Sequence, residues 1–189
     1  MAIPIKNDSQ IAKMREAGIV VAEVLALLES SVAPGVSTRD LDRIAAEHIH
    51  KRGAKSAFKG YFSYPGEICT SVNNEVIHGI PGIKTLKAGD IISIDVGVVL
   101  DGFHADAART FAVGEISPEA QRLIDATKET FYKAIEFAKE GFELLLDGVA
   151  KGNLGIPEYH ITRREINKLK TVDAYIEFCE KLFFENRDN

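Results

Sequence analysis

The sequence predicts an α/β chain of the α+β type, in which helices cover an antiparallel sheet and a helical appendage follows. Two segments near the N-terminus, residues 8–33 and 37–52, carry apolar residues at helical spacing. A β-rich stretch at residues 91–113 contains a tight-turn dipeptide at its centre, and a further helical pattern starts near residue 118.

The composition excludes several classes of protein. The 189 residues are 46% hydrophobic with a mean hydropathy of -0.04, which suits one soluble domain, or one domain with an appendage. No apolar run approaches the roughly 18–20 residues of a membrane span, and residues 1–10 lack an export signal. A net charge of -5 disfavours a general nucleic-acid surface. Two cysteines are too few to stabilise the fold through disulfides, so we expect a cytoplasmic protein. From the charge and the lack of long apolar runs, we expect neither nucleic-acid nor membrane partners.

The first helix is expected to begin at a cap formed by Asp8 and Ser9 and to end at Pro34-Gly35. Its core-facing stripe is predicted to consist of Ile11, Met14, Val21, Leu25 and Leu28.

Ser37-Thr38 should open the second helix, and Gly53 lies where a C-terminal glycine cap belongs. Its apolar side is expected to include Leu41, Ile44 and Ala45. From residue 57 to residue 79 the chain changes to short aromatic and β-branched runs broken by turn residues, which is typical of irregular strands and loops.

The segment at residues 91–113 reads as a β-hairpin with Asp101-Gly102 as its turn. That turn pairs Leu100 with Phe103 and therefore places Asp106 opposite Gly97. Because side chains alternate along a strand, Asp95 shares a face with Gly97. The two aspartates are then diagonal neighbours with backbones ~7–8 Å apart, close enough for their carboxylates to converge on metal ions.

Two interpretations of this aspartate pair remain open. Both carboxylates could simply face solvent on a half-exposed hairpin, or they could hold a divalent cation that relieves their repulsion. Carboxylates alone favour Mg or Mn, whereas an added imidazole would admit Zn, Co or Fe. His104 lies on the same predicted face and is read as a solvated neighbour, while His78 lies in a loop among glycines and a proline, where a backbone can approach a ligand closely.

The C-terminal quarter has a different character. A cap at Ser117-Pro118-Glu119 predicts a helix running towards Gly141. After a connector, the capping box at residues 162–165 predicts a last helix whose apolar stripe we interpret as a docking face, so that residues 162–185 are a candidate surface for self-association or for a partner.

Over residues 1–141 the chain resembles the type I methionine aminopeptidases. The resemblance is carried by four segments in the expected order, at residues 59–65, 68–81, 88–90 and 94–111. The two aspartates are eleven positions apart, which is the family's spacing for its first two metal ligands.

This resemblance implies one half of a pita-bread fold and a hydrolase that removes the initiator methionine from peptides or nascent chains. It implies Asp95 and Asp106 as ligands of a divalent metal (Mn, Co, Fe or Zn) and His78 as a catalytic hydrogen-bond donor to the scissile amide. The positions that match the methionine side-chain pocket are Tyr61, Phe62, Tyr64 and Cys69.

The resemblance ends near Gly141, so we expect two domains, a half-domain at 1–141 and a helical tail at 142–189. The family's second half supplies a histidine in a Gly-His-Gly setting and two glutamates as further ligands, and residues 142–189 contain no such setting; His160 lacks the flanking glycines. We therefore expect weak metal binding and little or no activity from the chain alone. Three functions stay open. The first is an enzyme that works alone or completes its site by self-association or through a partner chain. The second is a peptide-binding or protein-interaction module without catalysis, and the third is a truncated or recombined half-domain that retains only the fold.

Overall fold

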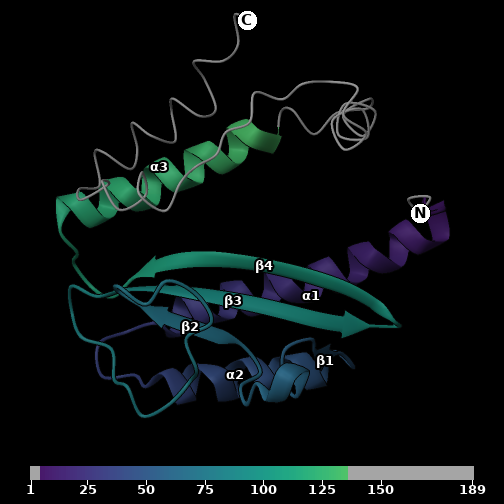
Figure 1. Ribbon diagram of the computed structural model, residues 1–189, viewed down its shortest axis with the longest axis horizontal. Helices are drawn as coiled ribbons and strands as arrows, with labels where there is room; N and C mark the ends of the chain where they lie inside the picture. Colours follow the sequence, from purple (N-terminus) through teal and green to yellow (C-terminus); the bar gives the residue numbers. More distant parts are fainter. Residues whose placement is uncertain (1–4, 136–189) are drawn as a thin grey trace, which may run out of the picture. The chain divides into compact units, whose positions relative to one another are not determined.

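The computed structural model describes residues 5–135 of the 189 (Figure 1). The chain divides into two units, Met1–Ser117 and Pro118–Asn189. The first unit contains the sheet, two long helices and all the predicted site residues. The boundary expected at residue 141, the connector and the last helix lie outside the described residues.

Helix α1 (Asp8–Ser31) begins one residue earlier than the sequence suggested. Its N-cap is Asn7, whose side chain accepts a hydrogen bond from the backbone N–H of Gln10, while the Gln10 side chain accepts one from the Asn7 N–H. The expected cap at Asp8 and Ser9 is therefore wrong, because an amide-based capping box satisfies the free N–H groups one position upstream.

Helix α2 (Thr38–Lys51) starts where the sequence predicted. Ser37 is its N-cap and forms a capping box with Asp40. At the other end Arg52 is the C-cap, and Gly53 adopts a positive φ of 72° that closes the helix.

Four strands form one antiparallel sheet with β3 (Ile91–Leu100) at its centre. Strand β4 (Phe103–Ala112) pairs along the whole of β3 on one side, and on the other side β1 (Lys55–Ser56) and β2 (Cys69–Val72) pair with different parts of β3. A 3-10 turn, η1 (Tyr61–Ser63), lies between β1 and β2.

The register of the β3–β4 hairpin confirms the prediction from the turn. Leu100 pairs with Phe103 and Gly97 pairs with Asp106. The turn residues Asp101 and Gly102 have φ values of 51° and 81°, the two consecutive positive angles that a tight hairpin turn of this type requires.

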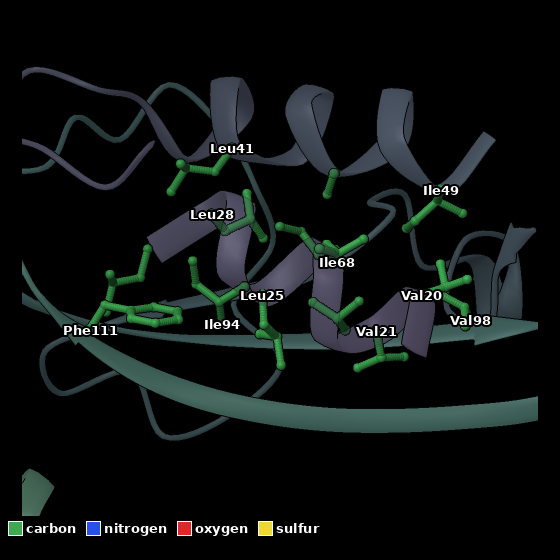
Figure 2. Packing of buried hydrophobic residues seen from close by; sticks show 14 of the residues in the cluster. Val20, Val21, Leu25, Leu28, Leu41, Ile49, Ile68, Ile94, Val98 and Phe111 are labelled. Atoms are coloured by element: carbon green, nitrogen blue, oxygen red, sulfur yellow. The ribbon is translucent and has the colours of Figure 1, made fainter. Parts of the chain in front are cut away.

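The core lies between one face of the sheet and the two helices (Figure 2). Helix α1 contacts β3 and β4, and α2 contacts α1 and β1. The alternate residues of β3 that face the helices are fully buried, namely Ile92, Ile94, Val96 and Val98.

The predicted core stripe of α1 is wrong in two places. Ile11 and Met14 are 43% and 39% exposed, because the buried stripe of α1 begins only at Ala17.

In the second unit, helix α3 (Pro118–Ile135) begins at the proline that the sequence predicted. The large apolar residues Phe131, Tyr132 and Ile135 are half exposed or more. None of the helices within residues 5–135 is both long enough and apolar enough to cross a membrane.

Candidate metal and substrate site

The candidate site lies on the face of the sheet opposite the two helices. Asp95 lies on β3 directly opposite Ala108, and Asp106 lies on β4 directly opposite Gly97, so the two aspartates are diagonal neighbours on one face. This face is polar along the hairpin, and the hydroxyl oxygens of Ser93 and Thr110 are 2.8 Å apart on it. The geometry that the sequence predicted for the pair is confirmed.

The carboxyl group of Asp95 is the less solvated of the two. Its Oδ1 atom is buried and has no hydrogen-bond partner among the described residues. Burial raises the pKa of this carboxyl, the nearby Asp106 raises it further, and His78 partly opposes them. A buried, unpaired carboxylate oxygen beside a second carboxylate is an environment that a cation would stabilise.

Gly97 leaves a gap between the two aspartates that Phe58 fills. A Cβ atom built on Gly97 would lie 2.5 Å from Cε1 of the Phe58 ring, so the ring rests directly against the glycine backbone. The segment is fixed there by a hydrogen bond of 2.9 Å from the Ala57 N–H to the Gly97 carbonyl. Phe58 therefore forms an apolar wall beside the carboxylates.

Cys69 and Tyr64 lie at the other side of Asp95. Cys69 is the direct partner of Asp95 across β2 and β3, and it is a buried free cysteine whose thiol pKa is raised mainly by burial. The Tyr64 hydroxyl lies 3.1 Å from the Ile68 carbonyl and 3.0 Å from the Gly79 carbonyl, and burial raises the pKa of this phenol. These two predicted pocket residues are thus brought together near Asp95.

The start of β2 is held in place by buried charge. Oδ1 of Asp42, on α2, accepts hydrogen bonds from the backbone N–H groups of Glu67 and Ile68, at 2.8 and 3.1 Å. The Glu67 side chain, itself buried, forms an ion pair of 2.7 Å with Lys59. Burial raises the pKa of the Asp42 carboxyl. These contacts anchor both ends of the 59–67 loop.

Tyr61 and Phe62 lie at the outer end of that loop. Their rings form an edge-to-face pair with centroids 4.6 Å apart, and they are 68% and 89% exposed. Phe62 has a φ of 45°, an unusual angle for a bulky residue. Unlike Tyr64 and Cys69, these two predicted pocket residues present their rings to solvent.

His78 lies in the long connection between β2 and β3. Its φ is 57°, its side chain is exposed, and its charge acts on Asp95. His104, on β4, pairs with Val99 of β3 and is exposed on the same side as Asp106.

The donor set fits a divalent cation in part. Asp95 and Asp106 offer hard carboxylate oxygens, and one of these oxygens is buried without a partner. Within residues 5–135, however, no three His, Cys, Asp or Glu side chains lie close enough together to hold an ion. The described part of the chain therefore offers two neighbouring carboxylates that could act as ligands.

Sequence reasoning missed Phe58 and Ser71 at this site. The signal for Phe58 was the glycine between the two aspartates, since a strand glycine often marks a close approach by another group. Ser71 gave no comparable signal, because its hydroxyl accepts a hydrogen bond from the Gly79 N–H. That bond joins a strand to a loop, and no regular pairing predicts it.

The comparisons with known proteins show the family. Residues 12–145 match the model of metallopeptidase family M24. The methionine aminopeptidase of Clostridium perfringens is 56% identical over 136 residues, which are 72% of this chain and 55% of that protein. Methionine aminopeptidase 1 of Bacillus subtilis is 48% identical over 139 residues, covering 74% of this chain and 56% of its own length.

A solved structure shows the same fold. The methionine aminopeptidase of Thermotoga maritima superposes with a TM-score of 0.69 at 42% identity, over 71% of this chain and 54% of that one. The fold class expected from the resemblance, one half of a pita-bread fold, is confirmed. The chain spans little more than half the length of the relatives that it matches.

Proposed function

Since the chain belongs to metallopeptidase family M24, we propose that its carboxylate face is the metal-binding half of a methionine aminopeptidase site. The observation that carries this proposal is the Asp95–Asp106 pair, two carboxylates on one face of a hairpin with a buried oxygen left unpaired. The chain is 48% and 56% identical to two methionine aminopeptidases, which supports an N-terminal methionine as the substrate.

In this proposal Asp95 and Asp106 would hold divalent metal. A bound divalent cation in such a site acidifies water and polarises the carbonyl of the scissile amide. Charge supports the assignment, because the neighbouring Asp106 raises the pKa of the Asp95 carboxyl, and a cation would offset that repulsion.

The chain's own residues then bind and orient the peptide. His78 would donate a hydrogen bond to the scissile amide, where a fixed donor stabilises the developing negative charge. The half-buried Tyr64 and the buried Cys69, with Phe58 beside Gly97, would form the inner wall for a methionine side chain, since aromatic ring edges and sulfur suit a thioether. Tyr61 and Phe62 would close over the methionine from the exposed side.

We propose that the 189-residue chain alone binds metal weakly and hydrolyses peptides slowly or not at all. Two carboxylates are a small ligand set, and metal affinity depends on the number and support of the ligands. Activity would then need ligands from another chain, by self-association or through a partner, and the 162–185 segment is the candidate surface for that contact.

The alternative is a peptide-binding or protein-interaction module without catalysis. The observation in its favour is the substrate side of the site: the Tyr64–Cys69 pair and Phe58 form a wall whose position depends on protein contacts alone. Such a module would bind an N-terminal methionine without releasing it. The sequence predicts a cytoplasmic location, and this prediction applies to the enzyme and to the binding module alike.

Methionine release from a Met-Ala-Ser peptide with added Mn, Co or Fe tests the proposal, beside an Asp95→Ala variant and an Asp101→Asn variant as control, since asparagine keeps the positive φ of the turn. Asp101 is an exposed hairpin carboxylate outside the site. Release that needs metal, is lost only in Asp95→Ala and rises more than linearly with protein concentration would support an enzyme completed by association. Binding of the peptide without release would support the module, and neither binding nor release would contradict both.

A further inference from the structure

His78 is held in a backbone conformation that its side chain does not favour. Its φ of 57° lies in the left-handed region, which is costly for a residue with a Cβ atom. Such conformations persist where the surrounding structure determines them, and they concentrate at functional sites. The contacts that determine this one are formed by the next residue, Gly79.

Both polar groups of the Gly79 backbone are bonded to the sheet side of the site. The Gly79 N–H donates to Oγ of Ser71 at 3.1 Å, and its carbonyl accepts from the Thr70 N–H at 2.8 Å. The Tyr64 hydroxyl lies 3.0 Å from the same carbonyl. The approach is so close that a Cβ atom on Gly79 would lie 2.1 Å from the Thr70 carbonyl oxygen.

Apolar packing does not hold the peptide next to Gly79 in this conformation. The large apolar residues on either side of His78, Val76, Ile77 and Ile80, are 87%, 68% and 63% exposed. The other anchors lie further along the loop. Glu75 pairs with Lys84 and accepts from the Val72 N–H, and Gly82 donates to Thr38. The two Glu75 contacts fix the base of the loop, and the Gly82 contact fixes its far end. The hydrogen bonds at Gly79 are therefore the contacts that hold the backbone of His78.

We propose that the hydroxyl groups of Ser71 and Tyr64 form a two-point clamp on Gly79, and that both residues are positioning residues for His78. Ser71 is 4% exposed and faces the same side of β2 as Cys69, so it lies on the same face of the sheet as Asp95. The clamp holds the peptide unit after His78 and thereby directs the imidazole towards the carboxylates. Its importance for catalysis rests on the proposed function, but the clamp itself is a property of the metal-free chain.

NMR of the full chain, without metal or peptide, tests the clamp through a local signature. A residue with positive φ gives a strong intraresidue HN–Hα NOE, and we expect His78 to show it in the unaltered protein. The double variant Ser71→Ala with Tyr64→Phe should lose it. In Ser71→Ala alone, the Gly79 amide should exchange about tenfold faster, as expected for the loss of one hydrogen bond.

Ser93→Ala is the matched control, because Ser93 is the direct partner of Ser71 across the sheet and its hydroxyl contacts Thr110 instead of the loop. It should leave both signals unchanged. Retention of the His78 signature in the double variant, or its equal loss in Ser93→Ala, would overturn the proposal. If the double variant does not fold, the Ser71→Ala variant decides, and an unchanged Gly79 exchange rate would overturn it.

The two proposals fail independently. Absence of metal binding and of methionine release would remove the proposed function while leaving the NMR result in place. An unperturbed His78 in the double variant would remove the clamp even in a protein that releases methionine.

Discussion

The carboxyl group of Asp95 lowers the stability of the folded chain, and packing does not explain its position. Among residues 5–135, the carboxyl has one buried oxygen without a hydrogen-bond partner, a second carboxyl as neighbour and a thiol opposite it. An unsatisfied polar group in such a place lowers stability, and sites that bind ligands are where proteins accept such losses. Stability and the proposed function are therefore opposed at this residue.

Asp95→Asn should stabilise the metal-free protein at neutral pH. Burial and Asp106 raise the pKa of this carboxyl above its ordinary value of 3.8, so the folded state binds its proton more tightly than the unfolded state does. The wild type consequently loses stability as the pH rises from 3.8 towards the raised pKa. The neutral amide escapes this loss, and we expect a gain of about 1 kcal/mol, or ~2–4 °C in Tm.

Thermal unfolding in a chelator at pH 7 and again near pH 3 measures this difference. The advantage of the variant should be present at pH 7 and absent at the lower pH, while Asp101→Asn, at the exposed turn, should match the wild type at both. An Asp95→Asn variant that is less stable than wild type at pH 7 in chelator would refute this electrostatic account.

Gly79 gives the sharpest steric prediction. Gly79→Ala places a methyl group 2.1 Å from the Thr70 carbonyl oxygen, and because that atom belongs to the backbone it has little freedom to move. We expect a loss of about 2–4 kcal/mol in the free energy of unfolding, measured in urea. Gly82→Ala is the control, since the nearest atom to its Cβ is 3.9 Å away, and it should change stability by less than ~0.5 kcal/mol. Equal effects from the two variants would contradict the close approach.

At the scale of secondary-structure elements, local chemistry accounts for what the sequence revealed and what it hid. The turn at Asp101-Gly102 fixed the register of twenty strand residues, because a two-residue loop leaves a single pairing for each position. The cap of α1 was misplaced, since Asn7, Asp8 and Ser9 are all good capping residues and only the reciprocal bond with Gln10 selects the first.

The site divides in the same way. The aspartate pair followed from strand alternation, which is a local rule. The contacts of Phe58 with Gly97 and of Tyr64 with Gly79 join segments whose spacing no local rule sets. The exposure of Tyr61 and Phe62 likewise depends on how a loop leaves the sheet. Their predicted place in a methionine pocket stays a prediction.

The link between α2 and β2 can be tested directly. Asp42→Ala leaves the N–H groups of Glu67 and Ile68 without their acceptor, and we expect a loss of about 2 kcal/mol in the free energy of unfolding. Asp42→Asn keeps an amide oxygen that can accept the same bonds and removes a charge whose burial is unfavourable. It should remain within ~1 kcal/mol of wild type in urea unfolding. Equal losses in both variants would show that the charge, rather than the acceptor, matters.

At the scale of the whole molecule, the chain matches a metallopeptidase family over residues 12–145 but spans little more than half the length of its relatives. The described part has a continuous core beneath one face of the sheet and the carboxylates on the other. The two faces are thus separable, so site variants on the carboxylate face should leave the core intact.

Titration of the full chain with Mn²⁺, followed by the loss of the free-ion EPR signal, tests the central claim most directly. The account predicts weak, saturable binding that disappears in Asp95→Ala and in Asp106→Ala and persists in Asp101→Asn. Mn²⁺ binding that is absent from the wild type, or that is unchanged in both site variants, would contradict the assignment of this carboxylate pair as a metal site.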